Sequence, residues 1–141
     1  MKTFLLKIQT MAGPVFKAPA QRIVVRTIAG DVAIMADHCN YCTAIGMGQA
    51  RVTMEDESVR TAACIGGMIT MMDNVCSVLP TSWEWADEID RARAEEARRL
   101  AEHQLSKPEL TAEERAAETA RLRRAQIRLA VAEQAGTKRG I

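Results

Sequence analysis

Residues 59–79 read VRTAACIGGMITMMDNVCSVL and contain three short apolar runs, separated by Gly66-Gly67 and by Asp73-Asn74. Each run has the length of a β-strand and is rich in valine, isoleucine, threonine or methionine. Gly-Gly and Asp-Asn pairs are typical of tight turns, because these residues adopt backbone conformations that most side chains disfavour. The stretch therefore predicts antiparallel strands joined by short turns.

The same alternation of apolar runs and turn residues extends back to the N-terminus. Gly30-Asp31 separates two of these runs, and the polar residues 55–58 form the tip between two others. The further runs read FLLKIQ, QRIVVRTI, DVAIM and QARVTM. Seven or more short strands without a helical period predict an antiparallel β-sandwich or barrel. We assign this domain to residues 1–80.

The composition changes after Pro80. The first 80 residues hold 13 charged side chains, whereas the following 61 hold 24, and alanine replaces valine and isoleucine as the common apolar residue. Residues 111–114, TAEE, form a capping box in which the threonine oxygen accepts an early backbone N–H. Good helix formers continue from there to Ala135, and Gly136 is expected to end the helix.

A second helix is predicted from Asp87 to Gln104, with Asp87 as its N-cap. Pro108 separates the two helices, since proline disfavours the helical conformation at the residue before it. A short break between two helices predicts an antiparallel hairpin. Residues 81–141 are therefore expected to form a linker and a helical hairpin, and the whole chain is a two-part α+β protein.

Composition also excludes several classes of function. A net charge of +1 excludes a strongly basic nucleic-acid-binding protein. The longest apolar run covers 11 residues, whereas a membrane-spanning helix needs about 20. Lys7 interrupts the apolar N-terminal run, so that run does not read as a signal peptide. We expect a cytoplasmic protein whose four cysteines are thiols.

His38, Cys39 and Cys42 lie within ADHCNYCTAIG, residues 36–46. Two thiolates and an imidazole at this spacing can bind zinc, and a C-x-x-C can also carry a thiol–disulfide couple. One hypothesis is therefore a stand-alone metal-binding or thiol-redox module. A zinc site needs a fourth ligand, but Cys64 and Cys76 lie twelve residues apart within strand patterns. We favour an ordinary loop with an unusual composition and predict no metal site.

The predicted hairpin contains few large apolar residues, so burial gives it little stability against the entropy lost on ordering. It is either a solvated, charged adaptor without a nucleotide site or a mobile arm with two resting positions. Arg124 and Arg128 lie four residues apart on one helical face, and Arg121 lies on the same side. An anion would relieve their repulsion. The alternative is that Arg128 points into solvent.

The order of a sheet domain and a helical hairpin, together with four sequence segments, resembles the epsilon subunit of bacterial F-type ATP synthases. The segments are GDVAIMADH, TAIGMGQARV, IGGMITMMDNVCSVL and IDRARAEEARRLAEHQL. Residues 30–34, GDVAI, stand where the family has a G-E-L-G-I-like run. His38 stands where its P-G-H ends, and Gly66-Gly67 at its S-G-G. Residues 36–42 depart from the family by lacking the proline and glycine.

The resemblance implies a non-catalytic subunit of the central stalk, peripheral on the cytoplasmic face of the cell membrane. Its sheet domain would bind the gamma subunit and the ring of c subunits, with the loops at Gly30, Asp31 and His38 facing the ring. The hairpin would either fold against the sheet domain or extend towards the alpha and beta subunits and inhibit ATP hydrolysis. No nucleic acid and no required cofactor are implied.

Some bacterial members of this family bind ATP on the folded hairpin through an I/L-D-x-x-R-A motif. Residues 89–94, IDRARA, match it in full. The resemblance thus implies ATP as a regulatory ligand. Arginines would bind its phosphates, and acidic residues would orient the purine, the ribose or the arginines. The residues implied are Glu84, Ile89, Asp90, Arg93, Ala94, Arg124 and Arg128.

Overall fold

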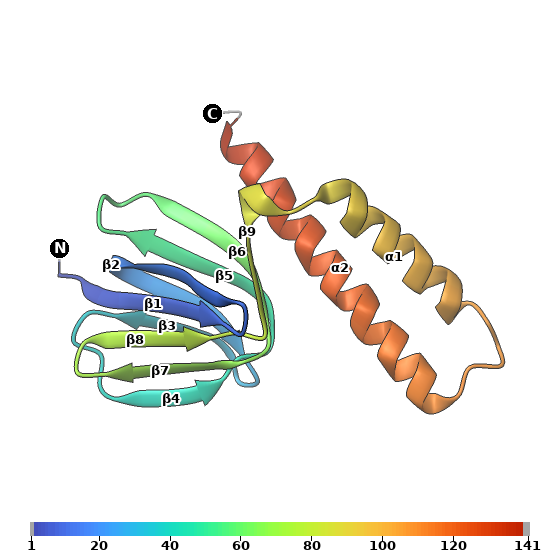
Figure 1. Cartoon of the computed structure of the whole chain (residues 1–141), viewed down its shortest axis with the longest axis horizontal. Helices are drawn as coiled ribbons and strands as arrows, with labels where there is room; N and C mark the ends of the chain where they lie inside the picture. The colour runs from blue at the N-terminus through green and yellow to red at the C-terminus, as the bar shows by residue number, and fades with distance from the viewer. Residues whose placement is uncertain (1, 140–141) are drawn as a thin grey trace. The chain divides into compact units, whose positions relative to one another are not determined.

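The computed structural model describes residues 2–139, and the side chains of residues 2–134. The chain divides into two compact units, Met1–Trp85 and Ala86–Ile141, which we call the sheet unit and the helical unit (Figure 1). The strands of the sheet unit are β1 (Phe4–Thr10), β2 (Gly13–Thr27), β3 (Gly30–Met35), β4 (Tyr41–Ala44), β5 (Met47–Met54), β6 (Val59–Ile65), β7 (Met68–Met72), β8 (Val75–Leu79) and β9 (Ser82–Trp85).

The strands form a sandwich that does not close into a barrel, with the order β4-β7-β8-β1-β2-β5-β6-β9 and with β3 beside β2. The long strand β2 joins the two layers. Its residues 13–20 pair with β1, and its residues 20–27 pair with β5 and β3. All strand pairs are antiparallel except β1 and β8, which run parallel. The predicted β-sandwich followed by a helical hairpin is confirmed.

All seven strands expected from the sequence are present, together with three strand segments that the sequence pattern does not predict. The first half of β2 contains Pro14 and Pro19 and lies outside the predicted strand runs, but it pairs with β1. Strand β4 lies within the C-x-x-C stretch and pairs with β7. Strand β9 lies within the segment that we assigned to the linker, and it pairs with β6. The sheet unit therefore extends past Pro80 to Trp85.

The core of the sheet unit follows from the two-residue period of its strands. On β1, Leu6 and Ile8 are buried and Lys7 between them is exposed, as the alternating faces of a strand require. Trp83 and Trp85 of β9 also face this core, and their ring centroids lie 5.2 Å apart at nearly a right angle. Both tryptophans are therefore core residues of the sheet unit.

The helical unit contains the 3-10 turn η1 (Ala86–Glu88) and the helices α1 (Arg91–Leu105) and α2 (Ala112–Arg139). The prediction of Asp87 as N-cap was wrong: Asp87 lies in η1, and Asp90 caps α1. The prediction that Gly136 ends the second helix was also wrong, since α2 continues to Arg139. Among the described residues, no helix combines the length and the apolar character needed to cross a bilayer.

Candidate functional site

The two helices of the helical unit begin at side-chain caps that the sequence specifies. The backbone N–H of Arg93 donates to Oδ1 of Asp90 at 3.1 Å, and that of Glu114 donates to Oγ1 of Thr111 at 3.1 Å. Each bond satisfies a donor that has no partner inside its helix. The predicted cap at Thr111 is confirmed, and the Glu114 carboxylate reaches back to accept from the threonine hydroxyl at 3.2 Å.

The seam between α1 and α2 is built largely from alanine. Ala94 and Ala101 of α1 and Ala125 of α2 are buried, whereas Leu100 is 52% exposed. Alanine permits close approach of two helices, but it removes little apolar surface from water. The hairpin is therefore held by small contacts, as its low content of large apolar residues predicts.

Antiparallel packing brings most of the predicted nucleotide-binding residues to one end of the hairpin. Ala94 lies 11 residues before the end of α1, and Arg124 lies 12 residues after the start of α2. At a rise of 1.5 Å per residue, both lie about 16–18 Å from the connecting turn. Arg93 and Arg124 are therefore at the same level, and Arg128 follows one turn further along α2.

The environments of these residues differ in ways that suit different roles. Ile89 and Ala94 are buried, Arg124 and Arg128 are half-buried, and Arg93 is exposed. Within the described part of the chain, no ion pair involves the side chains of Arg93 or Arg124. Glu84, by contrast, belongs to the sheet unit, where β9 places it opposite Ala63 of β6.

Other arginines of the hairpin are already engaged by carboxylates of their own helix. Arg98 donates hydrogen bonds to Glu95 and Glu102, and the bond to Glu95 is the main cause that raises the pKa of Arg98. Arg99 bonds to Glu96 in the same way and lowers the pKa of that carboxyl group. These pairs are solvent-exposed, so each contributes little to stability. They distinguish structural arginines from Arg93 and Arg124.

Replacement of Asp90 by alanine is expected to destabilise α1 by about 1 kcal/mol, because the Arg93 N–H loses its acceptor. Asp90→Asn keeps an oxygen at the cap and removes the charge, so its helicity should match that of the unchanged protein. Circular dichroism at 222 nm during thermal unfolding measures both variants. Equal loss of helicity in the two variants would show that the charge, rather than the cap, stabilises the helix.

The predicted ring-facing loops lie at opposite ends of β3. Gly30 begins this strand, and its backbone is in the left-handed region with φ of 113°. His38 follows the other end, where its Nδ1 lies 2.7 Å from the carbonyl oxygen of Cys39. Six residues of strand separate the two loops by about 17 Å. A flat partner at one end of the sheet unit would therefore meet only one of them.

The end of the sheet unit that holds Gly30 has a further feature that the sequence pattern does not reveal. Ile28, in the turn between β2 and β3, is 93% exposed. Backbone hydrogen bonds tie the neighbouring connections together, from Gly46 N to Arg26 O at 2.9 Å and from Ile45 N to Gly67 O at 2.8 Å. An exposed isoleucine on such a well-supported turn is a candidate partner contact.

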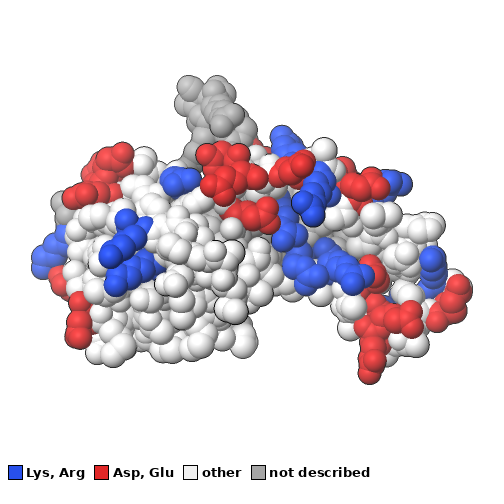
Figure 2. Space-filling model, in the orientation of Figure 1, with Lys and Arg blue, Asp and Glu red and all other residues white. Residues whose placement is uncertain are grey.

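The outer face of β7 and β8 carries exposed apolar side chains. Met68 and Met72 lie on one face of β7, and Leu79 of β8 pairs in register with Met68. These three residues are 47%, 59% and 52% exposed, respectively. Figure 2 shows a broad uncharged area over this part of the sheet unit, whereas charges of both signs cover the helical unit. We refer to Met68, Met72 and Leu79 as the methionine face.

The cysteines separate into an exposed pair and a buried pair. Cys39 and Cys42 are exposed, and Cys42 lies on the edge strand β4 opposite Thr70 of β7. Burial raises the pKa of both Cys64 and Cys76 from 9.0 to about 12. Among the described residues, no three or more histidine, cysteine, aspartate or glutamate side chains gather in a way that could hold a metal ion.

The native protein is expected to expose two reactive thiols at pH 8 and four after unfolding, because thiolates are the reactive form. Titration with a thiol reagent, with and without denaturant, measures this, and a Cys39→Ser/Cys42→Ser variant should show none in the native state. Four reactive native thiols would contradict the burial of Cys64 and Cys76.

The raised pKa of Cys64 and Cys76 also affects stability at high pH. Between pH 9 and about 12, the unfolded chain loses the protons of these two thiols while the folded chain keeps them, so the free energy of unfolding falls as the pH rises.

Comparison with known proteins gives consistent matches over most of the chain. The family described as "ATP synthase, Delta/Epsilon chain, beta-sandwich domain" matches residues 3–86. The ATP synthase epsilon chain of Caldicellulosiruptor bescii is 37% identical over 134 residues, which cover 95% of this chain and 96% of that protein. The ATP synthase epsilon chain of Ruminococcus albus is 33% identical and covers 95% and 99%, respectively.

A solved structure shares the fold of the whole chain. It is a chain of the mitochondrial ATP synthase of Euglena gracilis, from a complex described as OSCP/F1/c-ring. The TM-score is 0.78 at 18% identity, and the similarity covers 96% of this chain and 81% of that one. The shared region includes both the strands and the helices, so the combination of the two units is a common architecture.

Proposed function

Because this chain belongs to the epsilon-chain family of the ATP synthases, we propose that it couples rotation of an ion-driven ring to ATP synthesis and regulates ATP hydrolysis. It is an epsilon subunit of the central stalk of an F-type ATP synthase. The observation that carries this assignment is the match to bacterial epsilon chains along almost the full length of both proteins. We further propose that it is non-catalytic and peripheral on the cytoplasmic face of the membrane.

The sheet unit would transmit torque by binding the gamma subunit and the c-subunit ring. Support for the gamma contact comes from the methionine face, because methionine side chains adapt their shape to a partner and lose unfavourable contact with water when covered. Support for the ring contact comes from the turn that holds Gly30 and Asp31, with Ile28 exposed beside them. His38 lies past the opposite end of β3, so we do not assign it to the same contact.

Replacement of both Met68 and Met72 by glutamate is expected to weaken binding to the gamma subunit at least tenfold. Each charge would have to be desolvated against an apolar partner surface. Co-purification of the tagged gamma subunit with each variant measures the effect. Met35→Glu is the matched control, because Met35 is also 54% exposed but lies on β3. Equal gamma binding by the double variant would remove the methionine face from the proposal.

The helical unit would regulate hydrolysis by moving between a folded pose and an extended pose near the alpha and beta subunits. Its alanine-rich seam supports this proposal, because few large apolar contacts must break for it to open. ATP bound to the folded pose alone would stabilise that pose by about 2.7 kcal/mol at a hundredfold excess over Kd. A contribution of this size can decide the population of a weakly held hairpin.

The residues proposed to hold ATP are those that the hairpin brings within one helical turn of each other along its axis: Arg93, Arg124 and Arg128 for the phosphates, with Asp90 at the cap of α1. Ile89 and Ala94 belong to the same end, whereas Glu84 lies in the sheet unit and is not included in this set. Small-angle scattering of the intact protein, with and without millimolar magnesium-free ATP, tests the regulatory proposal. Unchanged compactness together with no calorimetric signal would refute ATP regulation and leave the assignment to the stalk intact.

A further inference from the structure

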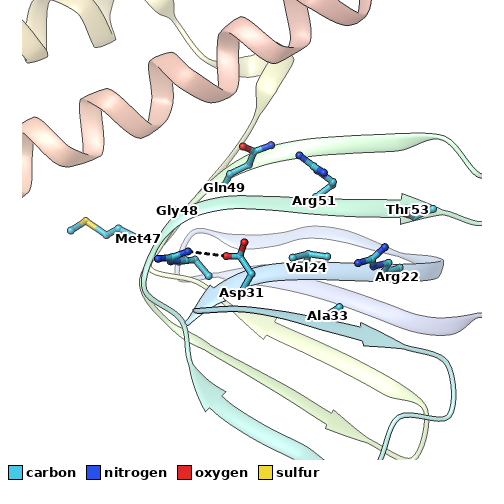
Figure 3. Close-up of a pocket in the computed structure, with 10 residues that line it drawn as sticks. Arg22, Val24, Asp31, Ala33, Met47, Gly48, Gln49, Arg51 and Thr53 are labelled. Carbon is cyan, nitrogen blue, oxygen red and sulfur yellow. Dashed lines mark hydrogen bonds and ion pairs between the residues drawn. The ribbon is translucent and has the colours of Figure 1, made fainter. Parts of the chain in front are cut away.

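A groove lies on the outer face of β2, β3 and β5, and of its lining residues only Asp31 has a part in the function proposed above. Its volume is about 610 Å³, and Figure 3 shows the side chains along it. Strand β2 contributes Arg22, Val24 and Arg26, β3 contributes Asp31 and Ala33, and β5 contributes Arg51. All of these residues belong to the sheet unit.

Strand register places three arginines on the same face. Arg22 and Arg26 lie four positions apart on β2, a distance of about 13 Å along the strand. Arg51 pairs in register with Val24, which lies midway between them. Neighbouring strands lie about 4.8 Å apart, so Arg51 is a diagonal neighbour of both other arginines. Long guanidinium side chains from these positions can reach a common point above the floor of the groove.

The groove carries an excess of positive charge. Arg26 Nη1 lies 3.4 Å from Oδ1 of Asp31, the one carboxylate among the described lining residues. Three arginines and one aspartate give a net charge of +2. No ion pair involves Arg22 or Arg51 within the described residues. Like charges at diagonal positions of a sheet repel each other, so an anion between them would be stabilised.

Strand β5 separates from β2 at one end of the groove. Register pairing of the two strands ends at Arg51 and Val24, and a hydrogen bond from Gly46 N to Arg26 O follows. The pairing of β5 with β6 continues through this stretch. Gly48 of β5 lies so close to Arg26 that an added Cβ would be 2.7 Å from the Arg26 Cβ. Glycine at this position lets the arginine side chain lie across the strand.

From this geometry we propose that the groove binds a small soluble anion with a chain of phosphate groups. Guanidinium groups suit phosphate because their planar donors match two oxygens at once. The volume lies in the range of small-molecule sites, roughly 300–1,000 Å³. The floor consists of Val24 and Ala33 and offers no aromatic anchor of the kind that stabilises a protein interface. A phosphate chain therefore fits better than a segment of a partner protein.

Calorimetric titration of the full chain with inorganic triphosphate at low ionic strength tests this inference. Arg22→Gln and Arg51→Gln are each expected to weaken binding at the groove at least fivefold, and the double variant to abolish binding there. Lys17→Gln is the matched control, because it removes one charge from β2 outside the groove. It should change Kd less than twofold. Circular dichroism of each variant establishes that the fold is retained.

The same titration separates the groove from the hairpin. An Arg124→Gln/Arg128→Gln variant is expected to keep the groove's affinity for triphosphate. If that variant loses all binding, or if Arg22→Gln and Arg51→Gln bind as tightly as the unchanged protein, the inference is overturned. Co-sedimentation with phosphatidylglycerol vesicles tests whether the ligand is a lipid headgroup. Vesicle binding that depends on Arg22 and Arg51, without any triphosphate binding, would identify a lipid headgroup and refute the proposal of a soluble ligand.

Discussion

Gly67→Ala is expected to destabilise the sheet unit by about 3 kcal/mol or more, because the added methyl group would overlap the main chain. A Cβ at this position would lie 2.2 Å from the carbonyl oxygen of Leu79 and 2.5 Å from the Cα of Pro80. Both are backbone atoms, so relief of the clash requires movement of the main chain. The φ angle of 107° adds strain, because alanine rarely adopts that conformation.

Gly13→Ala separates the strain from the clash. Gly13 also has a positive φ, 130°, but no atom lies within 4 Å of its Cβ position. The Gly13→Ala substitution should therefore destabilise the sheet unit by only about 1 kcal/mol. Urea unfolding followed by the fluorescence of Trp83 and Trp85 measures both variants, because both rings belong to the core of the sheet unit. Equal destabilisation by the two substitutions would mean that the backbone near Leu79 moves without cost.

Arg128→Ala is expected to weaken ATP binding about thirtyfold, or about 2 kcal/mol, the usual contribution of a hydrogen bond to a charged group. The half-buried position of Arg128, one turn after Arg124 and near the level of the α1 cap, supports a direct contact with the phosphates. Titration calorimetry with magnesium-free ATP measures the affinity. Unfolding of the sheet unit, followed by tryptophan fluorescence, should not change.

Arg121→Ala is the matched control for this substitution. Arg121 lies two turns earlier on α2, carries the same charge, and is paired with Glu118. Its loss should change the affinity less than twofold. Equal loss of affinity in the two variants would indicate a general effect of charge, and unchanged affinity of Arg128→Ala would refute the assignment of that arginine. In either case, the membership of the chain in the epsilon family is unaffected.

The fold could be predicted from the sequence wherever an apolar run of strand length is bounded by residues that favour turns. The runs at residues 59–65, 68–72 and 75–79 are strands because glycine and Asp-Asn turns bound them. The first half of β2 could not be predicted, because Pro14 and Pro19 normally interrupt strands. Residues 13–19 pair with β1 but not with β5, whose pairing begins at Ala20, and proline is tolerated where a strand has an open edge.

The candidate sites differ in how far sequence could identify them. The residues proposed to bind ATP could be found from the sequence, because a motif identifies those at the start of α1 and a helical spacing identifies those in the middle of α2. The groove could not be found in this way, since Arg22, Arg26 and Arg51 meet only through the register of two strands far apart in sequence. The predicted N-cap lies three residues from the observed one, because Asp87 and Asp90 both precede a helical pattern and only the η1 turn distinguishes them.

The parallel pairing of β1 with β8 has a consequence for biosynthesis. Strand β1 leaves the ribosome long before β8, yet Leu5 pairs in register with Val75. Until β8 emerges, the edge of β1 that pairs with it has no partner, and the sheet of the nascent chain stays incomplete. Contacts between segments this distant slow folding and expose the growing chain to association with other chains. Protection of this early intermediate, for example by a chaperone, would therefore matter more for the sheet unit than for the locally paired helices.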